Sequence, residues 1–308
     1  MQKQKLFEKL LRKPYLFRRI VTLSTKEFEM LSNKLEPEWK QREYERLSAR
    51  NNRKNKIGQG RKYELGSFSS LLLATCFYLR TSIGYELLSL IFDVDQSTLK
   101  RVVARVTPLL TDRFIPKTEI TKGKRRTNNL DELLDEFPEL KDVIFDGAEL
   151  TSKRPKKRQK QSYSGKKKRH TKKTVIALDK RTNIIVGVSP PKKGKIHDKK
   201  QLEQTNWDNK LPIGINRYGD SGYQGMPEET WVTPYKKPRT KELAKKQKQY
   251  NKKLAKQRIF VEHSIRGMKI FRRIGDTLTI KSDEFLFNVL LASANLYNFK
   301  RLVRQGIS

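Results

Sequence analysis

The chain has 308 residues, enough for two modest domains with hydrophobic cores of their own. Lysine and arginine number 69 against 33 aspartates and glutamates, which gives a formal charge of +36. Such a charge repels itself unless a polyanion lies nearby, so the composition favours nucleic acid as the partner. Hydrophobic residues make up 35% of the chain, which excludes a disordered basic tail.

The cysteine content and the apolar runs predict the compartment. Cys76 is the single cysteine, so no intrachain disulfide can form, as expected in a reducing cytosol. The apolar stretches at 71–79 and 285–299 are too short or too interrupted to span a bilayer, and the start, MQKQKLFEKLLRK, lacks a signal-peptide region. The sequence predicts a cytoplasmic, nucleoid-associated protein with no membrane partner.

Residues 1–65 predict a basic arm of short helices. Ser24 and Glu27 have the spacing of a capping box, in which each side chain accepts a hydrogen bond from the other residue's backbone amide. The segment 50–62, RNNRKNKIGQGRK, is interpreted as a flexible basic arm or, equally, as a solvated linker.

Residues 66–112 have the pattern of a helix-turn-helix. A short amphipathic helix at 84–92 and a turn at 93–95 precede a second helix, which we expect Ser97 to cap. The second helix of such a motif lies in the major groove, where its early residues contact base edges. A plain helical hairpin has the same spacing and stays open as the alternative. The candidate DNA-recognition residues are Gln96, Thr98, Lys100, Arg101 and Arg105, with the last three on the exposed face.

Residues 113–140 are expected to form a linker. A basic patch is followed there by an acidic helix, LDELLDEFPEL. Because the net charge of the segment changes from positive to negative, we place a domain junction near residue 140, with a catalytic domain from 141 to 308.

The segment from 141 onward alternates short strand patterns with helical ones. KDVIFDGAEL predicts a buried strand, and a basic hairpin tip with twelve lysines or arginines follows it. TVIALD and NIIVGVSP predict two more strands joined by a turn at 180–182. The order is completed by a helix at 197–204, strands at 215–220 and 230–235, a long basic helix, and an apolar helix at 284–299. This order matches an α/β, ribonuclease H-like mixed sheet with flanking helices, preceded by the all-α helix-turn-helix region.

The basic helix contains KQRIFVEHSIRGMKIFRR, in which one acid lies among cations. Arg258 precedes Glu262 by four residues and Lys269 follows it by seven, so a helix projects all three from one face. Taken alone, this stretch has the pattern of an exposed, salt-bridged helix. An adjacent apolar stripe would dock the helix on a core: Leu254, Val261, Ile265 and Met268.

Two further acids form a set with Glu262. Asp146 lies on the first predicted strand and Asp220 ends the fourth, while Glu262 lies on the helix packed beside them. Three carboxylates on separate elements suit two-metal phosphoryl transfer, because oxygen ligands must hold two Mg²⁺ ions about 3.5 to 4 Å apart around one phosphate.

With these motifs in this order, residues from about 70 to the end resemble a bacterial insertion-sequence transposase of the DDE class. In the group concerned, a helix-turn-helix precedes a DDE endonuclease domain. The matching pieces are VIFDGAEL, YSGKKKRHTKKT, GKIHDKK, YGDSGYQG, TPYKKP and RIFVEHSIRGMK. The last lies in the group's signature of Tyr, two residues, Arg, three residues, Glu, six residues and Lys. Arg258, Glu262 and Lys269 match it, and Ala255 occupies the tyrosine position.

The resemblance implies a catalytic and metal-binding triad of Asp146, Asp220 and Glu262. The implied cofactor is Mg²⁺, two ions in all, for which Mn²⁺ can substitute. The implied partners are double-stranded DNA, at transposon ends and at the target, and a second copy of the chain in a homodimer. The candidate phosphate-binding residues are Arg258, Arg266 and Lys269 on the helix, with Lys167, Lys168 and Arg169 in the hairpin tip.

The function so implied is binding of terminal inverted repeats with metal-dependent cleavage and strand transfer. The alternative is a transposase-derived DNA-binding regulator without catalysis. A nuclease acting on RNA or RNA–DNA hybrids is a third interpretation, which the helix-turn-helix disfavours.

Four other polar features are assigned minor roles. Glu149 is expected to be a surface acid and not a metal ligand. Asp198, which follows His197, is expected to cap a helix, with an approach to the metals as the alternative. Tyr223 is expected to be structural or to contact DNA, since no cluster of arginine and histidine flanks it as a covalent recombinase would need. The three histidines lack the spacing of a zinc site.

Overall fold

The computed structural model describes residues 4–50, 56–57, 59–60, 62–111, 141–205, 214–238, 240 and 242–306. The expected linker at 113–140 with its acidic helix lies outside the described residues, as do parts of the basic segment at 50–62. The chain divides into two compact units. The first comprises 1–111, 271–273 and 302–308, and the second comprises 112–270 and 274–301.

The described part of the first unit is built from helices. Its elements are α1 (Gln4–Leu11), α2 (Pro14–Val21), α3 (Thr25–Ser48), α4 (Phe68–Arg80), α5 (Tyr85–Phe92), α6 (Gln96–Val106) and the 3₁₀ helix η1 (Thr107–Leu110). Helix α4 forms the centre of this unit, because nearly all its side chains, Cys76 among them, are buried.

Helix α3 begins at the capping box expected from the sequence. The Glu27 amide donates to Ser24 Oγ at 3.2 Å, and the Ser24 amide donates to Glu27 Oε2 at 2.6 Å. The helix then runs for 24 residues through Pro37, so the expectation of short helices only is wrong here. Its length follows from a buried stripe at helical spacing that packs into the unit's core: Phe28, Leu31, Leu35 and Trp39.

Helices α5 and α6 form the expected helix-turn-helix. Asp93 adopts the left-handed conformation (φ 50°) in the turn between them. The predicted cap is wrong, however, because Asp95 and not Ser97 starts the second helix. The Ser97 amide donates to Asp95 Oδ1 at 2.7 Å, which makes Ser97 the second helical residue.

The candidate recognition residues of α6 differ in exposure. Lys100 and Arg101 are exposed, as expected, and Arg101 also folds back onto Ser97 Oγ at 3.1 Å. Arg105 is half-buried and donates to the Tyr63 hydroxyl at 2.8 Å, so its placement on the exposed face is wrong. It joins a polar network that stabilises the helical unit from inside.

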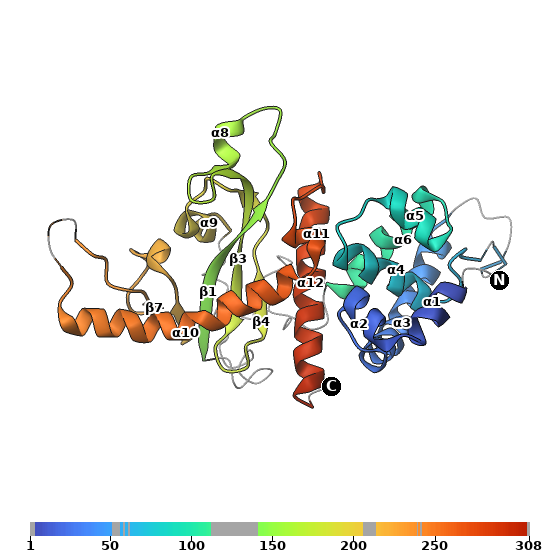
Figure 1. Cartoon of the computed structure of the whole chain (residues 1–308), viewed down its shortest axis with the longest axis horizontal. Helices are drawn as coiled ribbons and strands as arrows, with labels where there is room; N and C mark the ends of the chain where they lie inside the picture. Colours follow the sequence, from blue (N-terminus) through green and yellow to red (C-terminus); the bar gives the residue numbers. More distant parts are fainter. Residues whose placement is uncertain are drawn as a thin grey trace. The chain divides into compact units, whose positions relative to one another are not determined.

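The second unit contains a mixed sheet whose strand order is β2-β3-β1-β6-β7. Figure 1 labels β1, β3, β4 and β7 of this sheet. Strand β1 is antiparallel to β3 and parallel to β6, which in turn is parallel to β7, while β4 and β5 pair with β3. This arrangement confirms the predicted mixed α/β fold. The strands are β1 (Asp142–Thr151), β2 (Tyr163–Ser164), β3 (Arg169–Asp179), β4 (Ile185–Val188), β5 (Lys192–Lys193), β6 (Asn216–Tyr218) and β7 (Trp231–Val232).

Helices cover the sheet, and α10 crosses it in Figure 1. Val143 and Phe145 pack in one cluster with Leu202 of α9, so the side chains that alternate with them on β1 face the other side, where α10 lies. Helix α12 is buried along much of its length, as predicted, and Asn298 in it bonds to both backbone groups of Ile185 on β4. The helices are α8 (Gln159–Ser162), α9 (Asp198–Thr205), η3 (Ser221–Tyr223), α10 (Lys245–Lys269), α11 (Arg272–Gly275) and α12 (Asp283–Arg304).

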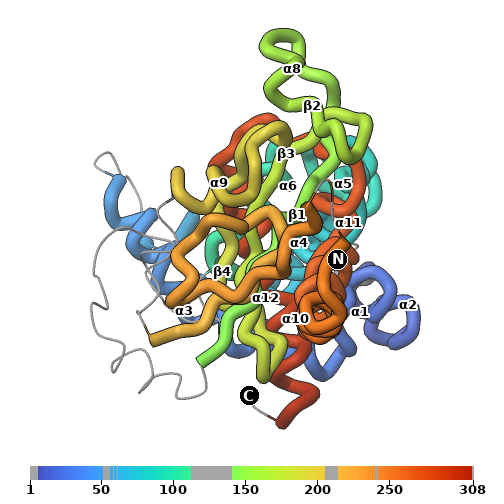
Figure 2. Tube along the Cα trace, turned by 90° about the vertical axis from the view of Figure 1, so that its left-hand side faces the viewer, coloured from blue at the N-terminus to red at the C-terminus, as the bar shows by residue number. Residues whose placement is uncertain are grey.

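The basic hairpin tip projects from one end of the sheet. Figures 1 and 2 both show the α8 segment standing beyond the strands that it connects. Across the part of the chain that the structure describes, no helix combines the length and apolarity that crossing a membrane requires.

Candidate active site

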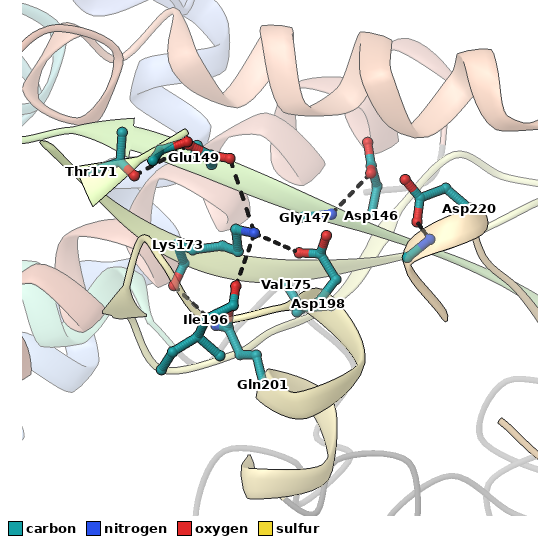
Figure 3. Close-up of polar contacts among 12 residues, drawn as sticks. Asp146, Gly147, Glu149, Thr171, Lys173, Val175, Ile196, Asp198, Gln201 and Asp220 are labelled. Carbon is teal, nitrogen blue, oxygen red and sulfur yellow. Dashed lines mark hydrogen bonds and ion pairs between the residues drawn. The ribbon is translucent and has the colours of Figure 1, made fainter. Parts of the chain in front are cut away.

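Asp146 and Asp220 meet because their strands are parallel neighbours. Ile144 on β1 pairs with Tyr218 on β6, so the residues two positions further along each chain lie side by side. Asp146 Oδ1 accepts from the Gly147 amide at 2.9 Å, and Asp220 Oδ1 accepts from the Gly222 amide at 2.7 Å. These bonds fix both carboxylates at the same place on the sheet (Figure 3).

Arg258 of α10 is the cation that faces this pair. Its Nη2 lies 3.7 Å from Asp146 Oδ1 and 3.9 Å from Asp220 Oδ2. The three side chains are between 18% and 26% exposed, so the contacts are only partly screened by solvent. The sequence predicted Arg258 on the catalytic face, and the structure places it there as the counter-ion of both aspartates.

The electrostatics of the pair favour an additional cation. Burial raises the pKa of Asp146 to about 6, and repulsion from Asp220 and Asp198 adds to the effect. The charge of Arg258 and the Gly147 amide lower the pKa but do not compensate. Asp146 and Asp220 come from separate elements, offer only oxygen ligands, and carry like charges that repel each other. Such a pair fits a divalent cation such as Mg²⁺.

Glu262 is not brought into this pair. Its side chain is exposed on α10, one turn beyond Arg258. Among the described residues, no three histidine, cysteine, aspartate or glutamate side chains are grouped so that they could hold a metal ion. The structure therefore assembles two of the three expected ligands.

The other cations of α10 have different positions. Arg266 is exposed, as a phosphate contact requires. Lys269 is half-buried, and its Nζ donates to the Glu149 carbonyl of β1 at 2.7 Å. Burial lowers the pKa of Lys269, although two nearby acids oppose the shift. In this position Lys269 ties α10 to β1.

A buried charged network lies on the opposite face of β1. Lys173 on β3 is 8% exposed, and its Nζ lies 3.2 Å from Asp198 Oδ1 and 4.0 Å from Glu149 Oε1 (Figure 3). Thr171 Oγ1 also donates to Glu149 Oε2 at 3.2 Å. Glu149 is therefore not the expected surface acid. Asp198 is the first residue of α9, and its carboxylate pairs with Lys173, so its expected capping role is wrong as well.

This network had only a weak signal in the sequence. Glu149 and Lys173 are opposite each other in the β1–β3 register, which local patterns do not reveal. The histidine–aspartate pair at 197–198 was the one visible cue to the network.

Tyr223 lies beneath the site and is fully buried. Its ring stacks on Trp231 with the centroids 5.2 Å apart and an interplanar angle of 19°. Burial is the largest of the causes that raise its pKa well above the ordinary value, so its hydroxyl stays protonated. Of its two expected roles, the structure supports the structural one.

The basic tip offers exposed cations for a polyanion. Lys167, Lys168 and Arg169 are all exposed, and Lys168 adopts a positive φ of 53° in the turn that precedes β3. Ser164 Oγ accepts from the Lys167 amide at 3.2 Å and stabilises this turn.

Comparisons with known proteins agree with this geometry. Residues 145–298 match a family model described as DDE superfamily endonuclease, and residues 63–116 match one described as the helix-turn-helix of DDE superfamily endonuclease. Over 160 residues, the chain is 36% identical to the probable transposase for insertion sequence element IS702 of Microchaete diplosiphon. That match covers 51% of this chain and 56% of the relative, so it spans little more than half of the relative's length.

Proposed function

The chain belongs to the DDE superfamily endonucleases, and from this premise we propose that it is a DNA transposase that binds terminal inverted repeats and carries out strand cleavage and strand transfer. The observation that supports this most directly is the convergence of Asp146 and Asp220 at neighbouring strands, facing Arg258. The helix-turn-helix supplies an element that fits the major groove.

The superfamily is generally dependent on divalent metal ions. In our proposal Asp146 and Asp220, joined by Glu262, hold two Mg²⁺ ions, for which Mn²⁺ can substitute. Metal ions bound there would lower the pKa of the attacking water or hydroxyl and stabilise the charge of the leaving oxygen. Glu262 is included because of its spacing from Arg258 and Lys269 in the sequence.

The protein's own groups position the DNA. Arg258 has a planar set of donors that suits the non-bridging oxygens of a phosphate, and it already lies over the two aspartates. Lys269 holds α10 against β1, which keeps Arg258 over the site. Water then attacks the phosphorus at the element end, and the 3′ oxygen leaves as a hydroxyl. That hydroxyl attacks a phosphorus of the target DNA and displaces the target strand's own 3′ oxygen, which leaves as a hydroxyl. The element end is thereby joined to the target, and no covalent link to the protein forms.

The remaining contacts are to the DNA backbone. Arg266 and the exposed cations of the tip, Lys167, Lys168 and Arg169, would bind phosphates without reading sequence. Binding should therefore weaken strongly as salt rises. Two element ends must be held at once, so we propose at least a homodimer during the reaction, acting on chromosomal DNA in the cytoplasm.

The decisive test mixes the purified full chain with repeat-containing DNA and Mg²⁺ or Mn²⁺. Wild type should cleave at the element end, while Asp146→Ala, Asp220→Ala and Glu262→Ala should bind the repeat without cutting it. Equal cleavage by all four proteins would refute the triad. Cleavage by Glu262→Ala alone among the variants would remove Glu262 from it. Tight repeat binding with no cleavage by wild type would identify a regulator instead.

The DNA-reading role of α6 needs a separate test. Lys100→Ala and Arg101→Ala should weaken binding to the repeat by about 1 to 3 kcal/mol each and reduce the preference for it over random DNA. Lys26→Ala is the matched control, since it removes an exposed lysine from α3 of the same unit. Equal losses on repeat and random DNA would show that α6 contacts phosphates only.

A further inference from the structure

A lysine is buried near the two aspartates, on the face of the sheet that α9 covers and opposite Glu149. Lys173 is 8% exposed, and besides its ion pair with Asp198 it donates to the Ile196 carbonyl at 3.1 Å. Lysines are seldom buried unless their charge is paired. The ion pair extends along β1 toward the two aspartates, because Asp198 lies on the side of Lys173 that is nearer to Asp146 and Asp220 (Figure 3).

Asp198 occupies a notch that two glycines leave open. A Cβ on Gly147 would lie 2.4 Å from Asp198 Oδ1. A Cβ on Gly222 would lie 3.2 Å from Asp198 Oδ2 and 2.7 Å from Asp220 Oδ1. The carboxylate of Asp198 therefore presses directly against the backbone that carries Asp146 and Asp220.

The position of Asp198 shows that it is not itself a metal ligand of this pair. Gly147 faces the α9 side of β1 and Asp146 faces the α10 side, since alternate residues of a strand point to opposite faces. Within the described part of the chain, no three acids are grouped closely enough to bind one ion together. The charge of Asp198 still acts on the pair, because its two oxygens lie against Gly147 and Gly222, next to Asp146 and Asp220.

We propose that Asp198 and Lys173 are positioning residues of this centre: Lys173 holds the Asp198 carboxylate in the glycine notch, from where its negative charge strengthens the binding of a divalent cation by Asp146 and Asp220. The inference rests on the proposed function, because it takes the two aspartates as the cation site. A merely structural ion pair would affect folding and leave the affinity for the cation unchanged.

The test measures Mn²⁺ binding to the full chain without DNA, by the electron paramagnetic resonance signal of free Mn²⁺. Asp198→Asn keeps the shape of the side chain and should weaken Mn²⁺ binding roughly tenfold, as loss of one charge near a divalent ion implies. Lys173→Met should weaken binding similarly, because Asp198 loses the group that holds it. Lys173→Arg should restore most of the affinity.

Asp142→Asn is the matched control. Asp142 lies on the same strand and pairs with Lys180 at 3.1 Å, against 3.2 Å for Asp198 and Lys173, but it lies at the other end of β1. This variant should bind Mn²⁺ as wild type does. Thermal unfolding of every variant confirms that the protein measured is folded.

The outcomes separate the inference from the function on which it rests. If Asp146→Asn abolishes Mn²⁺ binding while Asp198→Asn binds within twofold of wild type, the aspartate pair stands and the inference fails. If Lys173→Met binds more tightly than wild type, Asp198 stays in place without the lysine, and the positioning role of Lys173 is refuted. If wild type binds no Mn²⁺, the proposed cation site fails and the inference fails with it.

Discussion

Replacing Asp146 with asparagine should stabilise the folded protein at neutral pH in the absence of metal. Asp146 is 18% exposed, and burial outweighs the attraction of Arg258, 3.7 Å away, so its pKa rises from 3.8 to about 6. The ionised carboxylate is therefore less stable in the folded chain than in the unfolded chain. Asparagine keeps the shape of the side chain and removes the charge.

The raised pKa of Asp146 determines how the stability of the folded chain depends on pH. Below about pH 4 the carboxyl is neutral in both states, and its contribution to stability is fully present. As pH rises through 6 that contribution is lost, because the unfolded chain ionises more readily than the folded one. One pKa unit corresponds to about 1.36 kcal/mol, so the loss amounts to about 3 kcal/mol above pH 7. For a unit of this size, the variant should melt about 6 to 12 °C above wild type at pH 7.5 and near it at pH 4.

Thermal unfolding with a chelator, followed by circular dichroism from pH 4 to 7.5, measures this difference. Asp142→Asn is a control of opposite sign. Burial raises the pKa of Asp142, but bonds from Asn216 and Lys180 outweigh burial, so the pKa is lowered and the charge is stabilising at neutral pH. The variant should then lose stability at pH 7.5. If Asp146→Asn loses as much stability as Asp142→Asn, the account of Asp146 is refuted.

Three further predictions concern neighbouring groups. Arg258→Gln leaves two facing carboxylates without their counter-ion, so it should lower the stability at pH 7.5 by about 3 kcal/mol in a melting assay with chelator, and added Mg²⁺ should restore part of the loss. Gly147→Ala should weaken Mn²⁺ binding because its methyl group displaces Asp198, whereas Gly165→Ala, where a Cβ meets nothing within 4 Å, should not. Cys76 is fully buried and its pKa is raised to about 12 by burial, so a thiol reagent should react with it only after unfolding.

Features that depend on local sequence were predicted well. The β-branched apolar runs of β1, β3 and β4 predicted the sheet because strands buried on both faces have nearly continuous apolar sequences. The apolar stripe of α10 predicted a docked helix because its residues recur at helical spacing. Asp146 and Asp220 could be paired in advance because the order of elements determines which strands are neighbours. The capping box at Ser24 needed no tertiary information at all.

Features that depend on pairing across the fold were missed. Glu149 appeared to be a surface acid because nothing near it in the sequence shows that Lys173 lies opposite, 24 residues away. The contact of Lys269 was not foreseen for a similar reason, since its partner is a backbone carbonyl on β1, 120 residues away in the sequence. The cap at Ser97 was a local error, because Asp95 and Ser97 could each have capped α6, and Asp95 does so.

The length of α10 would set the distance between the site where a duplex is held and the site where it is cut. The helix spans 25 residues, and its exposed amino-terminal turns carry lysines well before Arg258 is reached. From Lys245 to Arg258 the axis advances roughly 20 Å, which equals about six base pairs of B-form DNA. A duplex lying along this helix would have its backbone held half a helical turn from the scissile phosphate, so α10 would act as a ruler. Contacts of the amino-terminal lysines with the DNA would then determine which base step lies at the site beside Arg258.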